Sequence, residues 1–546
     1  MINKALASAY GSGDSITPIN FRDSLVNVLA LDPNPCDLGI YPYDYFPSAF
    51  CLTAKLDFEK TGVSKVQRNP NLALFGNGIL VGIIDTGIDY QHKAFLNQDG
   101  TSRIVAIWDQ TIQDGDPPEG FTYGTLYNNE QINLALKSDN PLSIVPSIDE
   151  NGHGTAIASI IAGTEDTQNS FTGVVPASSL IVVKLKQAKK NIRAINFVPE
   201  GPVCYQDTDI LFAARYLFDT ARILRQPLAL CIALGTSQAG HDGIGATSTY
   251  LSYINEIPQI GVAITAGNEG NNQRHYFGTL DARTYRREFE LKVSSIDKKF
   301  GLEVWPYSPS RMTIEIITPN GESTQEVFPR LNECRKFTFV YDSTVVYVNN
   351  IITESSTGDQ LILVRMENAT EGIWKLRVRN IENAVSSFHA WLPAGDFISK
   401  DTIFLQSNPD TTILSPGNAM KTMTMTAYNQ NDDSILIQSG RGYTRSTPHV
   451  VPDLAAPGYN LTCAVPNGDY GNLTGTGAAT AYATGIVAMV MEWAILREYY
   501  ITITGTNIKN LLIRGADRDP GTTYPNNIWG YGKINIDGLF RALLSR

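Results

Sequence analysis

Two side chains in this sequence have the chemistry to activate a nucleophile, and the first is an aspartate. Asp85 closes the apolar run ILVGIID and is followed directly by Thr-Gly. A carboxylate at the end of a buried strand can orient an imidazole and stabilise the charged form of that ring. Taken alone, Asp85 is explained equally well as a turn aspartate before Thr-Gly.

The second is His153, in the stretch DENGHGTAIASIIAG. Glycines flank the imidazole on both sides and allow other backbone to come close, and a helix of small residues begins at once. An imidazole in this position can act as a general base. The remaining histidines have no such context: His92, His241, His275, His389 and His449. His153 is therefore the candidate base, rather than an ordinary residue at a helix start.

Two further stretches complete the set. Asn268 follows an apolar run in ITAGNEG, where its carboxamide can donate a hydrogen bond to a developing oxyanion, although Asn-Glu-Gly also makes an ordinary turn. The stretch GTGAAT (475–480) opens the apolar run AYATGIVAMVMEWAIL and predicts a buried helix. The residue near its tip, Gly477, carries no side chain.

The elements that must position these residues alternate along the chain. Apolar β-branched runs are followed by helix-like segments, with runs at 79–85, 179–185, 227–234 and 260–267 and helices at 155–163 and 209–224. This alternation predicts an α/β fold in which helices cover both faces of a parallel sheet. Because ligands meet such sheets at the carboxyl ends of the strands, we expect Asp85 and Asn268 at one edge.

The pattern changes between residues 283 and 405. Segments such as REFELKV, RMTIEIITPNGE and GIWKLRVRN alternate polar and apolar residues and are separated by turn signals. They predict an inserted all-β sandwich resembling a jelly roll. We therefore divide the chain into an N-terminal extension or prodomain remnant, a core in two parts and the insertion, at 1–65, 66–282, 283–405 and 406–546.

Composition excludes several classes of partner. The net charge of −11 disfavours nucleic acid and anionic lipid surfaces. No apolar run reaches the roughly 18 residues that span a bilayer, and the first residues lack the apolar core of a signal peptide. The six cysteines lie far apart, which predicts mostly buried free thiols and synthesis in the cytoplasm.

The order of aspartate, histidine, asparagine and small-residue helix resembles the subtilases, peptidase family S8. Members typically carry D-[ST]-G, H-G-T, a GN-containing oxyanion segment and G-T-S-x-A-x-P, which stand here as DTG, GHGT, AGNEG and GTGAAT. A closer resemblance is to the Csp proteins of clostridial spores. It is carried by DGTSRIVAIWDQTIQDG, SGRGYTRSTPHVVPDLAAPG, YPNNIWGYG and an insertion ending in HAWLP.

The resemblance implies a degenerate triad of Asp85, His153 and Gly477, with Asn268 as the oxyanion donor. In the family, the residue after Gly-Thr is the nucleophilic serine, and glycine has no hydroxyl to deprotonate or acylate. Thr476 is one residue away, and a shift of one residue turns its side chain from the site. We expect no rescue by Thr476, and one sequence leaves open whether Gly477 is natural or engineered.

The resemblance also implies a substrate cleft. Leu234, Gly235 and Thr236 are similar to the strand that pairs with extended substrates by strand addition, and Thr476 is expected to border the cleft. We expect no cofactor and no metal site, because the acidic turn GTEDTQNS (163–170) is explained as a solvated loop. The region before Asp85 is short for a prodomain, which was either removed or belongs to a longer polypeptide.

Two functions follow from these expectations. The first is a pseudoprotease that relays or scaffolds signals in spore germination. The resemblance implies that its partners are homologous Csp proteases and a cortex-lytic enzyme zymogen, that a small-molecule germinant is a further candidate partner, and that the protein lies in the cortex or coat region of the spore. The second is a serine endopeptidase of the same family whose nucleophile has been replaced. An S8 fold with an unrelated role is a third, less specific possibility.

Overall fold

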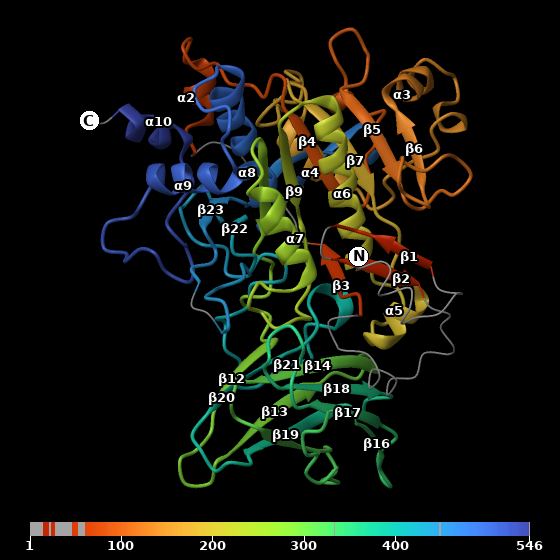
Figure 1. The fold of residues 1–546 in the computed structure, drawn as a ribbon, viewed down its shortest axis with the longest axis vertical. Helices are drawn as coiled ribbons and strands as arrows, with labels where there is room; N and C mark the ends of the chain where they lie inside the picture. Colours follow the sequence, from red (N-terminus) through yellow and green to blue (C-terminus); the bar gives the residue numbers. More distant parts are fainter. Residues whose placement is uncertain are drawn as a thin grey trace.

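The computed structural model describes residues 15–20, 23–27, 46–52, 61–331, 333–446 and 449–544. Figure 1 shows an α/β body above and a smaller all-β domain below, with β12 to β21 in the lower part. The sequence predicts both parts: helices alternating with a largely parallel sheet, and an antiparallel insertion. These two predictions of the fold are confirmed. The numerical domain boundaries and the jelly-roll topology remain predictions.

The body is built on one large sheet in the order β23-β22-β11-β9-β4-β7-β5-β6. Every neighbouring pair is parallel except β5 and β6, which are antiparallel at the edge. The strands are β4 (Leu80–Asp85), β5 (Ile104–Asp109), β6 (Thr125–Asn128), β7 (Ser179–Lys184), β9 (Leu228–Ile232), β11 (Ile260–Thr265), β22 (Met423–Tyr428) and β23 (Leu454–Pro457).

Each face of this sheet has its own apolar core, because successive side chains of a strand point to opposite faces. In β4, Val81 and Ile83 join one core, and Leu80 and Ile84 join the other. Helices α4 and α8 pack on the first face, and α6 and α7 on the second. The helices are α2 (Val63–Arg68), α3 (Asn129–Leu136), α4 (His153–Ala162), α5 (Lys190–Ile195), α6 (Asp207–Leu224), α7 (Ala246–Asn255), α8 (Thr476–Met491), α9 (Gly505–Gly515) and α10 (Ile536–Leu544).

Helix α8 is the central helix of the body. Together with the π-helical turn Glu492–Leu496 it forms a 21-residue segment that is long and apolar enough to cross a bilayer. However, 89% of its most apolar 18-residue window is buried inside the protein. The apolar run that the sequence places after GTGAAT is thus the core helix of the body, as predicted.

The β domain consists of two antiparallel sheets that enclose a core of their own. Their strand orders are β12-β20-β14-β18-β17-β16 and β15-β19-β13-β21. The strands are β12 (His275–Thr279), β13 (Arg286–Val293), β14 (Lys299–Pro306), β15 (Met312–Ile317), β16 (Cys334–Thr338), β17 (Val345–Ile351), β18 (Leu361–Glu367), β19 (Gly372–Asn380), β20 (Ser387–Trp391) and β21 (Ile403–Phe404).

Short segments near the N-terminus pack against the body. The hairpin of β1 (Ser15–Pro18) and β2 (Ser24–Asn27) contacts the second core through Ile19 and Leu25. β3 (Ala49–Leu52) is the middle strand of a small antiparallel sheet. Its neighbours are β8 (Tyr205–Gln206) and β10 (Leu234–Gly235), and a separate hairpin is formed by β24 (Leu461–Val465) and β25 (Asp469–Leu473).

The prediction about cysteines is correct for four residues and wrong for one. Free, buried thiols are found at Cys51, Cys204, Cys231 and Cys463. Cys334, at the start of β16, is instead disulfide-bonded. Spacing along the chain cannot reveal such a bond, because the fold decides which sulfurs meet. Cys36 lies outside the described residues.

Candidate active site

Asp85 and His153 lie in direct contact. Asp85 is the last residue of β4 and His153 the first of α4, and both are buried, at 0% and 6% exposure. The Nδ1 atom of His153 lies 2.7 Å from Oδ1 of Asp85, which also accepts a hydrogen bond from the backbone N–H of Thr86. A carboxylate bonded to Nδ1 fixes the orientation of an imidazole and favours its protonated form.

The glycines around His153 make this contact sterically possible. A Cβ atom on Gly154 would lie 2.2 Å from the carbonyl oxygen of Gly87, in the loop that follows Asp85. Gly152 caps the helix with φ at 84°, a left-handed conformation that suits glycine. The Gly-His-Gly sequence therefore lets the start of α4 lie directly on the Asp85 loop.

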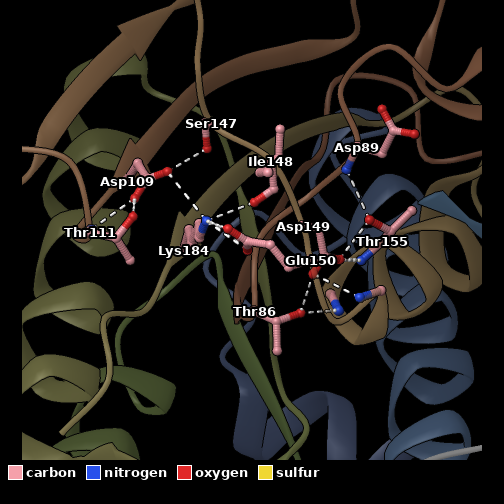
Figure 2. Close-up of polar contacts among 12 residues, drawn as sticks. Thr86, Asp89, Asp109, Thr111, Ser147, Ile148, Asp149, Glu150, Thr155 and Lys184 are labelled. Carbon is pink, nitrogen blue, oxygen red and sulfur yellow. Dashed lines mark hydrogen bonds and ion pairs between the residues drawn. The ribbon is translucent and has the colours of Figure 1, made fainter. Parts of the chain in front are cut away.

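Asp149 joins the two segments and lies between Thr86 and Thr155 in Figure 2. Its Oδ1 accepts hydrogen bonds from the hydroxyl of Thr86 and the N–H of Gly152, and its Oδ2 accepts from the N–H and hydroxyl of Thr155. The Thr86 hydroxyl in turn accepts from the N–H of Gly154. Asp149 is 3% exposed, so these bonds are shielded from water. It thereby holds the residue after Asp85 and the first turn of α4 in one register.

A second charged group supports the loop that carries Asp149 (Figure 2). The Nζ atom of Lys184, at the end of β7, donates to the carbonyl of Ile148 at 2.8 Å and pairs with Glu150 at 3.0 Å. It also lies 3.8 Å from Asp109, whose other contacts are to Thr111 and Ser147. The sequence analysis missed this network. The only available signal was the pair of acidic residues just before Asn-Gly-His.

Asn268 meets the start of α8. Its Oδ1 accepts hydrogen bonds from the N–H of Thr476 at 3.1 Å and from the hydroxyl of the same residue at 3.0 Å. These two donors identify the oxygen end of the amide. The Nδ2 end has no acceptor among the described residues. An amide held in this way presents a donor for an oxyanion.

Gly477 is the second residue of α8 and is buried. It offers the imidazole no hydroxyl. The neighbouring hydroxyl of Thr476 is engaged elsewhere, because it bonds to Asn268 and accepts from the hydroxyl of Thr265 at 2.7 Å. Thr476 is fully buried, with 0% exposure. Its side chain is therefore part of the packing beneath Asn268, and its oxygen is not available as a substitute nucleophile.

The strand expected to bind substrate is already paired. In β10, Leu234 and Gly235 are in antiparallel register with Leu52 and Cys51 of β3, and the thiol of Cys51 donates to the carbonyl of Gly235. The other edge of β3 pairs with β8, so β3 fills the space between two strands of the body. Thr236 instead exchanges backbone hydrogen bonds with Ser415. The chain's own segment β3 thus occupies the edge of β10 that the sequence analysis assigns to substrate.

No group of three or more His, Cys, Asp or Glu side chains suited to a metal ion occurs in the described part of the chain. In the acidic turn 163–170, Asp166 accepts hydrogen bonds from Asn169 and Tyr470 and pairs with Lys93. Those contacts hold the carboxylate lower in pKa than usual, with the Lys93 bond as the largest cause. The turn is explained by these bonds.

Comparison with known proteins decides the family. The family model described as Peptidase_S8, the subtilase family, matches residues 76–197 and 383–532, and these segments include Asp85, His153 and Gly477. The chain belongs to the subtilase family. The unmatched residues between the two segments include most of the β domain, as expected for a domain inserted into a subtilase.

Three named proteins show how far the likeness extends. The structure of the CspB protease of Clostridium perfringens matches this subtilase with a TM-score of 0.79 and 28% identity, over 89% of this chain and 96% of that one. The minor extracellular protease Vpr of Bacillus subtilis is 23% identical over 491 residues, or 86% of this chain. The match covers only 52% of Vpr and 34% of a C5a peptidase from Streptococcus pyogenes, which is 22% identical.

Proposed function

We propose that this subtilase is a catalytically inactive pseudoprotease that acts in spore germination signalling. The observation that carries the proposal is Gly477, which stands where family members have the nucleophilic serine. Without that hydroxyl, an acyl-enzyme cannot form. In subtilisin, loss of the serine lowers kcat by about 2 × 10⁶-fold, so any remaining hydrolysis would be marginal.

The pairing of β3 with β10 and β8 supports the same proposal. A protease must release its product and admit the next peptide, whereas here β3 is hydrogen-bonded on both edges, to β10 and to β8. A partner that docks near the small sheet β10-β3-β8 would contact β3 rather than an unpaired strand edge. Such a surface suits regulation or scaffolding more than turnover.

The role in germination rests on similarity to the CspB protease. We propose that the chain regulates or scaffolds the activation of a cortex-lytic enzyme zymogen by homologous Csp proteases, in the cortex or coat region of the spore. A small-molecule germinant completes the set of proposed partners. No nucleic-acid partner is proposed, because the net charge is −11.

A second candidate function is favoured by the state of the remaining machinery. His153 and Asp85 are 2.7 Å apart, and Asn268 retains its donor. An active endopeptidase whose serine has been replaced would have the same geometry. In that case the active form would cleave the cortex-lytic zymogen, and residue 477 would be the only position that prevents catalysis.

The variant Gly477→Ser tests whether the rest of the site is intact. We expect a fluorophosphonate probe to label Gly477→Ser but not the unaltered chain, because the Asp85–His153 pair can activate a restored hydroxyl. The double variant Gly477→Ser/His153→Ala is the control and should not be labelled. Inhibitor-sensitive peptide hydrolysis by the unaltered chain would refute the inactive assignment.

Germination tests the role itself. Spores carrying Gly477→Ser should germinate normally if the protein acts by binding alone. A spore that germinates only with the serine variant would favour the second function. Normal germination of spores lacking the protein altogether would contradict both.

A further inference from the structure

A short segment between β20 and β21, residues 394–398, lies against both β3 and the β domain. Ala394 and Phe397 join one apolar cluster with Cys51 of β3. Ile398 joins the core of the β domain instead. Figure 1 shows β3 at the end of the body that faces the β domain. We call residues 394–398 the strap, because they connect the cluster around β3 to the core of the other domain.

A buried ion pair in the loop between β11 and β12 holds the strap. Arg274 and Glu269 are both buried, and Nη1 of Arg274 lies 3.1 Å from Oε2 of Glu269. The same Nη1 donates to the carbonyl of Gly395 at 2.7 Å, and Nη2 donates to the carbonyl of Ile398 at 2.9 Å. Oε1 of Glu269 accepts the backbone N–H of Gly395 at 2.9 Å. Both ends of the strap are therefore bonded to one ion pair.

The ion pair depends on the strap in return. A buried ion pair is stable only when further hydrogen bonds satisfy its remaining donors and acceptors. The strap supplies two carbonyl acceptors to Arg274 and one amide donor to Glu269. Nε of Arg274 already lacks an acceptor. If the strap moved away, the guanidinium would keep only Glu269 as a partner among the described residues, so the strap is held by more than its apolar contacts.

The backbone of the strap lies directly on β3. Gly395 has φ at 61°, and a Cβ atom there would lie 2.7 Å from both Cβ and Sγ of Cys51. The thiol of Cys51 donates to the carbonyl of Gly235 in β10. One side chain of β3 is thus enclosed between β10 and the strap. We expect β3 to leave its place between β10 and β8 only when the strap moves.

The ion pair also adjoins the candidate active site. Glu269 directly follows Asn268, the residue predicted to face an oxyanion. Nδ2 of Asn272 donates to the backbone carbonyl of Asn268 at 3.1 Å and to Oε2 of Glu269 at 2.9 Å. A displacement of the strap therefore reaches two parts of the body, β3 and the loop that carries Asn268.

We propose that the strap is an inter-domain switch through which the β domain controls the release of β3. While the ion pair binds the strap, β3 is held between β10 and β8; movement of the β domain that displaces the strap frees it. Ile398 is the point of transmission, since its side chain packs in the β-domain core and its carbonyl binds Arg274. The proposal does not depend on the inactive assignment, because Gly477 takes no part in these contacts.

The thiol of Cys51 reports the state of β3. It is free and buried, so its alkylation requires a local opening. Iodoacetamide labelling of each cysteine in the full native chain is measured by peptide mass spectrometry. Arg274→Met breaks the ion pair, and Ile398→Ala removes the anchor in the β domain. Each should speed labelling of Cys51 at least tenfold and leave the buried thiols of Cys231 and Cys463 within about twofold, because labelling follows the population of the open form.

The matched control is Lys509→Met. Lys509 forms a buried ion pair with Asp453 in the body, 3.1 Å apart, without contact to the strap. This variant should not speed labelling of Cys51 relative to Cys231. Equal acceleration of Cys51, Cys231 and Cys463 in the Arg274 and Ile398 variants would show that the contacts only stabilise the whole chain. That outcome, or no acceleration at Cys51, would overturn the proposal.

Hydrogen exchange of the unaltered chain decides the matter even if a variant fails to fold. In urea below the unfolding transition, the backbone amides of the strap and of β3 should lose protection together and with the same dependence on urea, because they open in one step. Loss of protection in β3 while the N–H of Gly395 stays protected would show that β3 opens without the strap, and the switch would be refuted.

Discussion

Asp149 and Arg365 are both charged and almost completely buried, at 3% and 1% exposure, yet their surroundings are opposite. Asp149 receives four hydrogen bonds from three residues that hold the Asp85 loop against α4. Arg365 has one bonded nitrogen and two without an acceptor. Asp149 is therefore a buried charge that stabilises the fold through its hydrogen bonds, whereas most of the hydrogen-bonding capacity of Arg365 is unused.

The comparison extends to a third group. His275 is also buried, at 1% exposure, and it resolves its burial by staying neutral, since burial lowers its pKa to about 3. A guanidinium has no comparable escape at neutral pH, because burial lowers the pKa of Arg365 only to about 9. The three buried groups thus differ: Asp149 is hydrogen-bonded, His275 is neutral, and Arg365 is charged with two nitrogens that lack an acceptor. Each can be tested by removing the group.

The largest effect is expected at Asp149. Asp149→Ala should lower the free energy of unfolding by about 5 kcal/mol, because several buried donors lose their acceptor at once. Denaturant unfolding at neutral pH measures the loss. In the Gly477→Ser background the same change should also abolish fluorophosphonate labelling, since the His153 helix loses its register with Asp85.

Glu150→Ala provides the matched control for Asp149. Glu150 is the next residue, its side chain is 65% exposed, and its one ion pair is with Lys184. Lys184 is buried but keeps the carbonyl of Ile148 and the carboxylate of Asp109 as partners, so loss of the exposed Glu150 carboxylate should cost only about 0–1 kcal/mol. An equal decrease in the free energy of unfolding for the two variants would mean that the hydrogen bonds of Asp149 do not stabilise the protein more than an exposed carboxylate does.

The next effect depends on pH. The pKa of His275 in the folded protein lies below its value in the unfolded chain, so the unfolded chain takes up a proton first as the pH falls. The neutral imidazole therefore contributes stability above about pH 6.5 that is lost on acidification. Between pH 7 and pH 4 the loss is about 3 kcal/mol, at 1.36 kcal/mol for each pH unit.

His275→Gln should remove that loss. The stability difference between the unaltered chain and the variant is measured by denaturant unfolding at pH 7 and at pH 4. We expect the unaltered chain to lose its advantage over the variant in acid. A difference that stays constant with pH would show that the pKa of His275 is the same in the folded and unfolded chains.

A smaller effect is expected where the charged network depends on close backbone packing. Gly154→Ala places a Cβ 2.2 Å from the carbonyl of Gly87, and neither backbone can yield easily. Such overpacking costs about 2 kcal/mol. Gly301→Ala is the control, since its Cβ meets only ordinary contacts. Similar unfolding midpoints for the two variants would show that the contact at Gly154 is readily relieved.

How much of this could be predicted from the sequence depends on whether a feature is local. The strand that ends at Asp85 and the helix that begins at His153 each have a local signature, and the parallel sheet follows from their alternation. The roles of these residues in a triad remain a prediction. Parallel sheets collect their strand ends at one edge, which explains why local patterns were enough to suggest the site.

Features that depend on pairing between distant segments were not predictable. Cys51 and Gly235 are 184 residues apart, and neither the sequence of β3 nor that of β10 indicates that the two strands pair. The disulfide at Cys334 is of the same kind. Arg365 sits in an alternating strand, QLILVRM, where period-two spacing gives its face but not what that face meets.

The smallest effect on stability is expected at Arg365, where the sign of the change decides whether the guanidinium stabilises the fold. Arg365→Met should raise the free energy of unfolding by about 1 kcal/mol, because an apolar side chain of similar length replaces a buried charge with two unsatisfied nitrogens. The lost bond to Asn349 limits the gain. Denaturant unfolding of the variant and the unaltered chain measures the difference. A clear loss of stability in Arg365→Met would place Arg365 with Asp149, among the charges that stabilise the fold.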